Sequence, residues 1–472
     1  MTNRMSRTVS RRAALGGMMA AAALPGAALA QSPRVFSPEE FGARGDGRTN
    51  DTAAFARMAQ AVNRAGGGRI VLRRTVYLVG EQHPGLQLDP FAFAPRPILR
   101  LSGCVRGVSI EGNGATLRCA AGLRYGTFDR ATGRAIELPM PNTRPGPLAT
   151  PYDYMVLVEQ CRGPVSIADL ELDGNVGALL IGGPWGDVGR QISCDGLFLR
   201  DNGGDEVVRN LHTHHHARDG MILAGLTTLP AGTRRSFTGI RSEWNGRQGC
   251  SLIGGHGYAF ADSRFAHTGR ARLSTPPAAG FDIEAESAPI RNLRFDRCTF
   301  EDNSGCGLVA DSGDSADARF ADCRFVGTTN WSLWPNKPGF RFDRCEIVGA
   351  CVHAFGSPDP ARATRFDDCT FTDAPARSAN RKVFLSGPMA NLSDSRNVLF
   401  ARCRFDATHG AQLPWSTAAI YDGCTMRQSG TAPAYPRGTF RGANRIDGAV
   451  DIAASPVRGR LLLNGRAIPP RL

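Results

Sequence analysis

The hexapeptide Phe295-Asp296-Arg297-Cys298-Thr299-Phe300 returns as Phe320-Ala321-Asp322-Cys323-Arg324-Phe325, and the pattern aromatic-x-x-Cys-x-apolar continues along the chain. Its later copies are Phe342–Ile347, Phe366–Phe371, Phe400–Phe405 and Tyr421–Met426, at intervals of 21 to 34 residues. Upstream copies with another residue in place of cysteine are Phe260–Phe265, Phe237–Ser242, Val208–Thr213 and Ile167–Leu172. Ten such units predict an elongated repeat protein in which each unit packs on its neighbours.

The repeat is a β repeat. Within each unit apolar residues alternate with Arg, Asp, Glu or Thr, which is the period of a strand with one buried face, and helical spacing is nearly absent. A second pattern runs in phase with the first and places a turn glycine before another strand: Gly196, Gly220, Gly249, Gly280 and Gly307. A unit of 21 to 25 residues with about three short strands predicts one turn of an all-β, single-stranded parallel β-helix.

Composition is consistent with this architecture. The chain has 472 residues, of which 42 % are hydrophobic and 21 % charged, and these values exclude wholesale disorder and a multi-span membrane protein. The 56 glycines and 30 prolines favour turns over long helices. The formal charge of +13 comes almost entirely from arginine, which suits bidentate contact with acidic groups, although a coding bias toward Arg explains it equally well. The sequence contains no basic run or recognised module of the kind that binds nucleic acid.

Residues 1–30 resemble a bacterial twin-arginine export signal. Arg11-Arg12 is followed by Leu15, an uncharged run and then Ala28-Leu29-Ala30, after which cleavage is expected. An uncleaved helical anchor is the alternative. The mature protein is therefore expected in the periplasm or outside the cell, with no membrane span. Six of the thirteen cysteines occupy the hexapeptide, where a small inward side chain is needed, so they are predicted to pack rather than to form disulfides.

The N-terminal part predicts a cap for the solenoid. Asp51 can cap a helix whose apolar residues, from Phe55 to Val62, share one face, and Gly66-Gly67-Gly68 ends that helix. We therefore expect a helical cap and opening segment over residues 31–100, the β-helix over 101–430 with an insertion at 120–154, and a C-terminal cap or tail over 431–472.

The residues from Phe41 to Thr52, read Phe-Gly-Ala-Arg-Gly-Asp-Gly-Arg-Thr-Asn-Asp-Thr, together with the helix, Gly67-Gly68 and Tyr77-Leu78-Val79, resemble the opening segment of the pectate lyase superfamily, in its rhamnogalacturonase/epimerase-like group. The resemblance implies a right-handed parallel β-helix of the pectin lyase type that handles polysaccharide. Members include lyases, hydrolases, epimerases and phage tailspikes, so the resemblance does not name the reaction.

A cluster of acids offers a catalytic site. Counted from the pattern glycine, Arg200, Ala224, Ile253, Glu284 and Asp311 form one outward column, and Asp282 lies in the column beside it. Stacked coils bring Glu284 and Asp311 together, and such crowding raises the pKa of one carboxyl, as a glycosidase requires. A solvated face paired with arginines is the first alternative. A calcium site of Asp282, Glu284 and Asp311 is the second.

Basic residues occupy the turns before these strands, and stacked turns predict a basic ridge beside the acids. β-Elimination of a uronate needs a cation on the sugar carboxylate and a base on the ring proton. The candidates for these roles are His216, Arg218 and Arg247 as catalytic residues and Arg270 as a substrate-binding residue. A solvated turn or adventitious metal binding is the alternative for the run His214-His215-His216.

Further substrate contacts are expected from rings. Trp331 and Trp334 follow Asp311 by one coil, and His353 follows them, so that their faces can stack on sugars. One of the two tryptophans is expected in the core. His256 lies between two glycines in a short motif similar to one in polygalacturonases, and it is a further substrate-binding candidate.

Three functions follow as hypotheses. The preferred one is an exported lyase that cleaves an acidic, uronate-containing polysaccharide by β-elimination. The second is a glycoside hydrolase of the same fold that uses the paired carboxylates. The third is a noncatalytic β-helix that binds glycan or supports the cell envelope. No cofactor is assigned to these functions, apart from the calcium alternative.

Overall fold

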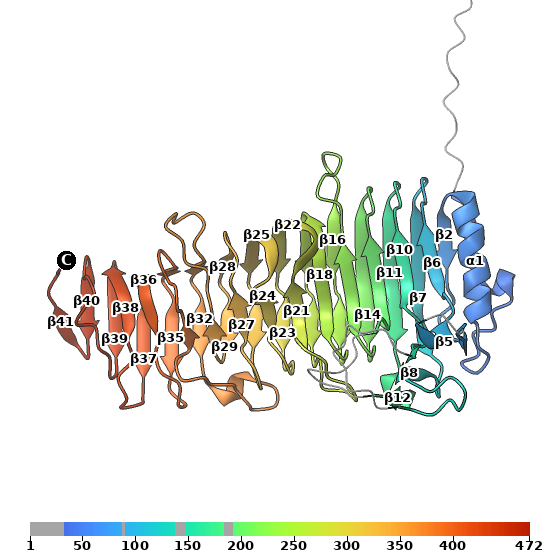
Figure 1. The fold of residues 1–472 in the computed structure, drawn as a ribbon. Helices are drawn as coiled ribbons and strands as arrows, with labels where there is room; N and C mark the ends of the chain where they lie inside the picture. The colour runs from blue at the N-terminus through green and yellow to red at the C-terminus, as the bar shows by residue number, and fades with distance from the viewer. Residues whose placement is uncertain (1–32, 87–89, 137–146, 184–191) are drawn as a thin grey trace, which may run out of the picture. The chain divides into compact units, whose positions relative to one another are not determined.

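The computed structural model describes residues 33–472 except 87–89, 137–146 and 184–191. The expected export signal, residues 1–30, lies outside the described residues. From Arg34 to Leu472 the chain is one compact unit (Figure 1). In the part of the chain that the structure describes, no helix is long and apolar enough to cross a membrane.

Parallel strands wind into the predicted right-handed β-helix. Each full coil supplies a strand to three faces, and each strand pairs in parallel with the equivalent strands of the coils before and after it. The register follows the repeat, because Phe295 pairs with Phe320, Phe320 with Phe342 and Phe342 with Phe366. The predicted fold class is therefore confirmed.

The strands of the first face are β6 (Leu99–Ser102), β10 (Tyr154–Glu159), β13 (Asp195–Arg200), β15 (Asp219–Ala224), β18 (Gln248–His256), β21 (Ala279–Ile283), β24 (Leu308–Ala310), β27 (Leu333–Pro335), β30 (Cys351–Val352) and β33 (Ala390–Asn391). Those of the second face are β1 (Val35–Phe36), β2 (Gly68–Val71), β16 (Arg235–Thr238), β19 (Tyr258–Ala261), β22 (Ala285–Asp296), β25 (Gly313–Ala321), β28 (Arg341–Asp343), β31 (Arg365–Asp367), β34 (Leu399–Ala401), β36 (Ser416–Asp422) and β38 (Pro436–Arg441). Those of the third face are β3 (Val76–Val79), β17 (Arg241–Glu243), β20 (Arg264–Ala266), β23 (Thr299–Glu301), β26 (Arg324–Val326), β29 (Glu346–Val348), β32 (Thr370–Thr372), β35 (Arg404–Ala407), β37 (Thr425–Gln428), β39 (Ala443–Asp447) and β40 (Arg460–Leu463). Three longer strands bend across the second and third faces: β7 (Val108–Cys119), β11 (Val165–Asp173) and β14 (Glu206–His214).

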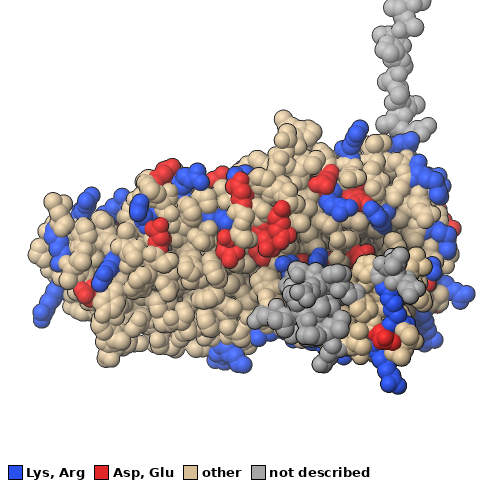
Figure 2. Space-filling view, in the orientation of Figure 1, with Lys and Arg blue, Asp and Glu red and all other residues tan. Residues whose placement is uncertain are grey.

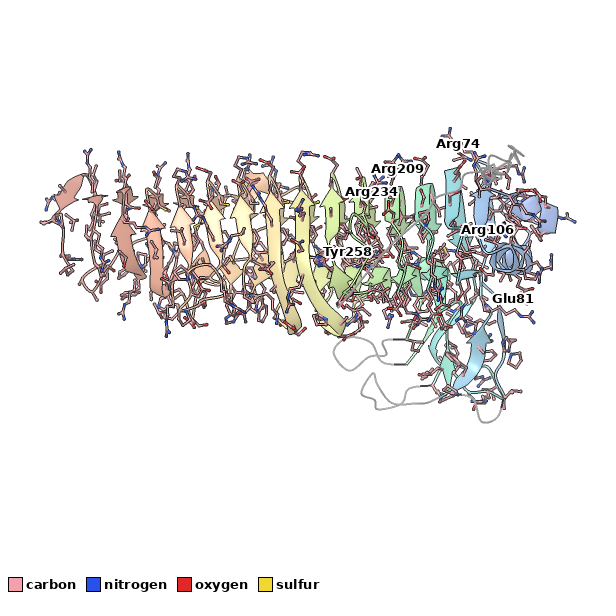
Figure 3. All side chains as sticks on the ribbon, turned by 90° about the horizontal axis from the view of Figure 1, so that it is seen from above. Arg74, Glu81, Arg106, Arg209, Arg234 and Tyr258 are labelled. Carbon is pink, nitrogen blue, oxygen red and sulfur yellow. The ribbon has the colours of Figure 1, made fainter. Side chains whose placement is uncertain are left out.

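The interior is a stack of aromatic rings and thiols. Phe342 lies face to face with Phe320 at 4.7 Å between ring centroids and with Phe366 at 4.8 Å. All thirteen cysteines are free and buried, among them the six of the hexapeptide that were predicted to pack. Their thiols also donate weak hydrogen bonds to carbonyls, as Cys424 does to the Phe400 oxygen at 3.2 Å. Figure 3 shows Arg209 and Arg234 at the outer edge of the coils, whereas Tyr258 lies inside.

The hexapeptide forms the corner between the second and third faces. Its third residue has a positive φ of about 50° in successive coils, including Arg297, Asp322, Arg344 and Asp368. This single left-handed residue turns the chain sharply, so that one strand ends at the residue after the aromatic and the cysteine precedes the next strand. Arg344 also forms an ion pair with Asp322 of the coil before it, at 2.7 Å. The corner therefore explains why Asp and Arg alternate at this position.

The pattern glycines have a different role from the predicted one. Gly196, Gly220, Gly249 and Gly280 lie within strands of the first face rather than in turns, and none has a positive φ. A Cβ on Gly220 would lie 2.2 Å from Oγ of Ser242. These residues are glycine because the opposite side of the coil packs directly on their backbone.

The N-terminal cap contains α1 (Thr52–Ala65), preceded by η1 (Pro38–Phe41). Its buried face includes Phe55 and Val62, and Gly66 ends it with a φ of 72°. The expected capping by Asp51 is wrong. Although Asp51 holds the N-cap position, its carboxylate instead accepts hydrogen bonds from the backbone N–H groups of Arg44 and Gly45, at 2.7 and 3.0 Å. The opening loop therefore takes the acceptor that a helix cap would use.

The remaining elements lie beside the coils and at their C-terminal end. A small separate sheet contains β4 (Gln82–Pro84), β5 (Phe91–Pro95), β8 (Arg124–Thr127), β9 (Leu148–Ala149) and β12 (Leu180–Gly182). Short helices η2 (Val176–Ala178) and η3 (Pro375–Arg377) lie in connections. Parallel pairing continues beyond residue 430 to β40, where β41 (Arg466–Ile468) closes the stack as an antiparallel partner. The solenoid is thus longer than the expected range 101–430.

Candidate functional site

An open cleft of about 690 Å³ lies on the outer side of the first face, over β21, β24 and β27. Three acids line it, Asp282, Glu284 and Asp311, together with Trp331 and Trp334. The other lining residues are small, hydroxyl-bearing or amide-bearing, or proline. Figure 2 shows acidic side chains gathered in a patch near the middle of the solenoid.

Strand alternation places the acids outside. On β21, Phe281 and Ile283 are buried in the core, so Asp282 between them points outward. Glu284 and Asp311 directly follow β21 and β24, two strands that pair in register. The predicted outward column is interrupted upstream, because a bulge pairs Ala224 with Gly254 rather than with Ile253.

Asp282 is the most buried acid of the cleft. Its Oδ2 accepts a 2.6 Å hydrogen bond from Nε2 of Gln248, one coil away, and only 4 % of the residue is exposed. Burial, followed by the neighbouring charge of Glu284, raises the pKa of Asp282 well above its ordinary value. The protonated form of Asp282 is thus favoured more strongly than that of an exposed aspartic acid.

Glu284 is half-buried and lies 3.8 Å from Nη2 of Arg247. Burial and the charge of Glu286 raise the pKa of Glu284, and Arg247 opposes that shift. Asp311 is exposed at the rim. The strongest electrostatic coupling to Asp282 comes from Glu284, so the closely coupled carboxyls are Asp282 and Glu284 rather than the predicted Glu284 and Asp311.

Arg247 and Arg218 belong to a row of charge pairs that leads to the cleft. Nη1 of Arg247 lies 3.2 Å from Oδ2 of Asp219, and Arg218 makes two 2.8 Å hydrogen bonds to Asp195. Burial works against the charge of Arg218, but Asp195 and Asp219 outweigh it and raise the pKa of Arg218. Neither arginine lines the cleft, and Arg218 is committed to its bidentate pair. Arg218 is therefore a poor base for elimination.

His216 lies inside the coil rather than on the predicted ridge. It is fully buried, and its Nδ1 lies 2.9 Å from the hydroxyl of Tyr152. Burial lowers the pKa of His216 well below its ordinary value, so the ring is neutral. The sequence interpretation was wrong here because β14 ends at His214 and His215 has a left-handed φ of 54°, so the strand alternation does not extend to His216.

The other substrate-binding candidates are dispersed. Arg270 is held by Asp302, Thr328 and Thr329 and does not line the cleft. His256 lines a different cavity, of about 490 Å³, where its Nε2 lies 3.4 Å from Nδ2 of Asn292. Among the described residues, the predicted basic side chains therefore do not form a ridge along the acids.

The aromatic residues come together at the cleft. Trp331 and Trp334 pack edge to face at 5.1 Å between ring centroids, and His353 lies against Trp334 at 5.0 Å. Both tryptophans are partly exposed, so the expectation that one belongs to the core is wrong. Trp334 is an outward residue of β27 opposite Val309, and Trp331 lies in the preceding turn. The indole N–H of Trp334 has no hydrogen-bond partner among the described residues.

The calcium alternative lacks a formed ligand set. Among the residues that the structure describes, three or more metal-ligating atoms converge within 4.8 Å in two overlapping groups only, and both contain His214. Asp282, Glu284 and Asp311 do not form such a group. Calcium binding needs several oxygens around one point, so these acids would have to move together to provide it.

An arginine-lined groove of about 800 Å³ was missed by the sequence interpretation. It lies over the second face of the later coils and is lined by Arg319, Arg341, Arg365, Arg402 and Arg441, with Asp343 and Asp367 among them. The first three pair in register on successive coils. The signal was present in the repeat, because each of these three arginines directly precedes the aromatic residue of a hexapeptide.

Comparisons with known proteins give short or distant similarities. No protein-family profile matches the chain. The capsule KN3-specific Depolymerase 1 of Klebsiella phage KN3-1 is 51 % identical over 77 residues, which cover 16 % of this chain and 10 % of that protein. The chain therefore matches about a tenth of the length of this curated relative.

Solved structures similar to this one share little sequence with it. The A-module of the mannuronan C-5 epimerase AlgE4 from Azotobacter vinelandii is 15 % identical, with 90 % of this chain and 97 % of that chain covered and a TM-score of 0.44. The tailspike protein gp49 from Pseudomonas phage LKA1 is 11 % identical, with 91 % and 81 % covered and a TM-score of 0.40. At these values the similarity carries no functional information.

Proposed function

We propose that this chain is an exported enzyme that hydrolyses a polysaccharide in the acidic cleft. The observation that carries the proposal is the convergence of Asp282, Glu284 and Asp311 with Trp331 and Trp334 in one open cleft. Paired carboxyls with unequal environments are what glycoside hydrolysis requires, and aromatic faces bind sugar rings.

Asp282 serves as the general acid. Its raised pKa keeps a proton available, and Gln248 holds one carboxyl oxygen while the other remains for the leaving oxygen of the sugar. Asp311, exposed at the rim, supplies the second carboxylate, either as the base that takes a proton from water or as the nucleophile. The first course inverts the anomeric configuration and the second retains it.

Glu284 and Arg247 set the charge around Asp282. Glu284 raises the pKa of Asp282, whereas Arg247 opposes that shift and lies 3.8 Å from Glu284. Replacement of either residue therefore changes the pH at which Asp282 loses its proton. Both are positioning residues in this mechanism.

The substrate at the cleavage point is a neutral sugar. No Lys, Arg or His is among the described residues that line the cleft, and three carboxyls there would repel a uronate. Capsular polysaccharide is the first class to test, because a short stretch of the chain is closely similar to a capsule-specific phage depolymerase. Export, predicted from the twin-arginine segment, would place the enzyme where such polymers occur.

β-Elimination of an acidic glycan is the second candidate, and Arg247 is the observation that favours it. Of the predicted cations, Arg247 approaches an acid of the cleft, although it is also paired with Asp219. An elimination mechanism would use Arg247 to neutralise or deprotonate the uronate.

The decisive experiment is a screen of the purified protein against capsular, neutral and uronate-containing polysaccharides. Reducing ends and the ultraviolet absorbance of unsaturated uronates are followed together. Reducing ends without that absorbance support hydrolysis, and both signals together indicate elimination. Binding without either signal would replace the enzymatic proposal with the noncatalytic one.

A further inference from the structure

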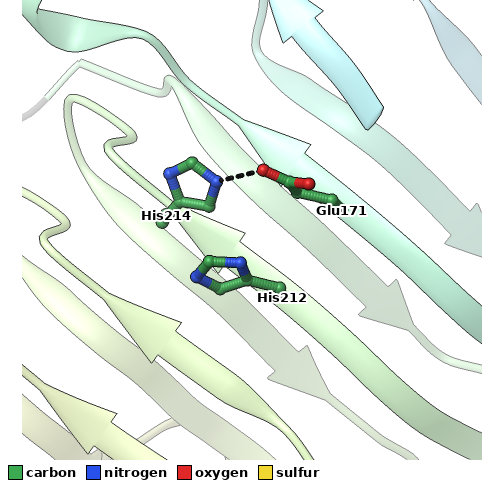
Figure 4. Close-up of side chains that lie close together, drawn as sticks. All are labelled: Glu171, His212 and His214. Atoms are coloured by element: carbon green, nitrogen blue, oxygen red, sulfur yellow. Dashed lines mark hydrogen bonds and ion pairs between the residues drawn. The ribbon is translucent and has the colours of Figure 1, made fainter. Parts of the chain in front are cut away.

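A group of histidines and acids lies on the third face, apart from the acidic cleft. Glu171 on β11 and His212 and His214 on β14 belong to neighbouring coils, and one ligand atom from each lies within 4.8 Å of the others (Figure 4). None of these residues lines the cleft. Their arrangement follows from the sheet register, which pairs Glu171 directly with His212.

We propose that Glu171, His212 and His214 bind one divalent transition-metal ion, of which zinc is the best match, and that the ion clips two coils together. Two imidazole nitrogens and one carboxylate oxygen form a ligand set typical of zinc, and they leave a further position for water. The proposal does not rest on the hydrolytic function.

A hydrogen bond from outside the group orients one of the proposed ligands. Oε2 of Glu171 accepts a 2.9 Å hydrogen bond from Thr116 of the preceding coil, which leaves Oε1 directed at Nε2 of His214, 3.0 Å away. The centroid of the His212 ring lies 4.2 Å from that of His214, and Nε2 of His212 lies 3.5 Å from Oε2 of Glu243. His212 is therefore weakly engaged and can turn a nitrogen toward an ion.

The second nitrogen of His214 favours the same arrangement. Its Nδ1 lies 2.7 Å from Nδ1 of His215 and 3.7 Å from Oδ1 of Asp173. Asp173 is itself fixed by a 2.7 Å ion pair with Arg118. A metal on Nε2 leaves Nδ1 of His214 as a donor to these two groups, and outer hydrogen bonds of this kind orient metal-bound histidines.

The site is accessible and its role is structural. The side chains of Glu171 and His212 are 36 % and 28 % exposed, so an ion can enter from solvent. The ligands come from two adjacent turns of the solenoid, and an ion that binds the folded state alone stabilises it. Bound metal should therefore raise the melting temperature.

The test uses the full-length purified protein after chelator treatment and dialysis. Zinc titration calorimetry should give one tight site per chain, cobalt should give the absorption bands of a low-coordinate imidazole site, and zinc should raise the melting temperature. His212→Gln and His214→Gln should each weaken zinc binding by at least about tenfold and remove the thermal shift. Both variants should keep the circular dichroism spectrum and the metal-free melting temperature of the wild type.

Two matched controls keep the assignment falsifiable. His353→Gln changes a histidine elsewhere and should leave zinc binding unchanged. His215→Gln should weaken binding less than His212→Gln, because His215 acts behind the ligands. The proposal is overturned if zinc gives no thermal shift and no stoichiometric binding, if His353→Gln is as damaging as His212→Gln, or if binding depends on His215 and not on His212.

Discussion

Nε2 of Gln248 donates a 2.6 Å hydrogen bond to Oδ2 of Asp282 across two adjacent coils. The bond fixes one carboxyl oxygen of Asp282 and leaves the other for the cleft. Because Gln248 pairs with Ala279 in the sheet, the position of the proposed acid depends on correct stacking of these two coils.

Asp282→Asn and Glu284→Gln should separate proton transfer from charge tuning. Loss of the general acid should lower kcat by about 100-fold or more. Glu284→Gln should mainly lower the pH at which activity declines, because Glu284 helps to raise the pKa of Asp282. Steady-state kinetics across a pH series provide the measurement. Asp314→Asn is the matched control, since Asp314 is paired with Arg291 outside the cleft, and a comparable loss there would contradict the assignment.

Asp282 should also make stability depend on pH. Its folded-state pKa is raised above the unfolded value of about 3.9, so between these values the folded protein holds a proton that the unfolded chain has released. The free energy of unfolding therefore falls as pH rises from about 4 toward the raised pKa. Asp282→Asn should melt higher than the wild type at neutral pH, with the difference shrinking toward pH 4. An unchanging difference would show that Asp282 does not titrate in this way.

Trp331→Ala and Trp334→Ala should weaken substrate binding. Stacking of an aromatic face contributes roughly 0.5 to 1.5 kcal/mol, which corresponds to about a twofold to tenfold rise in KM or Kd. The expected change in kcat is smaller, because the rings are not proposed to transfer protons. Tyr435→Ala removes an exposed ring away from the cleft and should leave both constants unchanged. Equal effects from all three variants would argue against a sugar platform.

Phe342→Ala should destabilise the middle of the solenoid. The ring packs between Phe320 and Phe366, and a buried Phe→Ala change costs about 3 to 5 kcal/mol. The urea midpoint, followed by circular dichroism, should fall clearly, whereas Phe342→Leu should cost less because it fills more of the space. A midpoint unchanged by Phe342→Ala would mean that the ring stack contributes little to stability.

The repeat could be predicted because the same corner between two strands recurs in successive coils. A corner that needs a left-handed residue between two inward side chains, in the later coils an aromatic ring and a thiol, imposes a similar hexapeptide on successive coils. Simple alternation then places Asp282, Glu284 and Asp311 outside. These constraints are local, so the sequence displays them. The parallel β-helix and the outward position of the acids were predicted on this basis.

The environment of each side chain could not be predicted in the same way. The contact of His216 with the hydroxyl of Tyr152 and the bidentate pair of Arg218 with Asp195 depend on which residue of another coil lies opposite them. A bulge at Ala224 shifts the register by one residue, and no sequence pattern marked it. The hydrogen-bond partner of a polar side chain is therefore harder to predict than the face of the strand on which that side chain lies.

The acidic cleft occupies only a short part of the solenoid. The lining residues come from 274 to 334, whereas the later coils continue for more than a hundred residues, and none of the described lining residues belongs to them. Gain or loss of one whole coil near the C-terminal end would lengthen or shorten the arginine groove without altering the proposed acid. Reach along a polymer and cleavage of that polymer could thus change independently of each other.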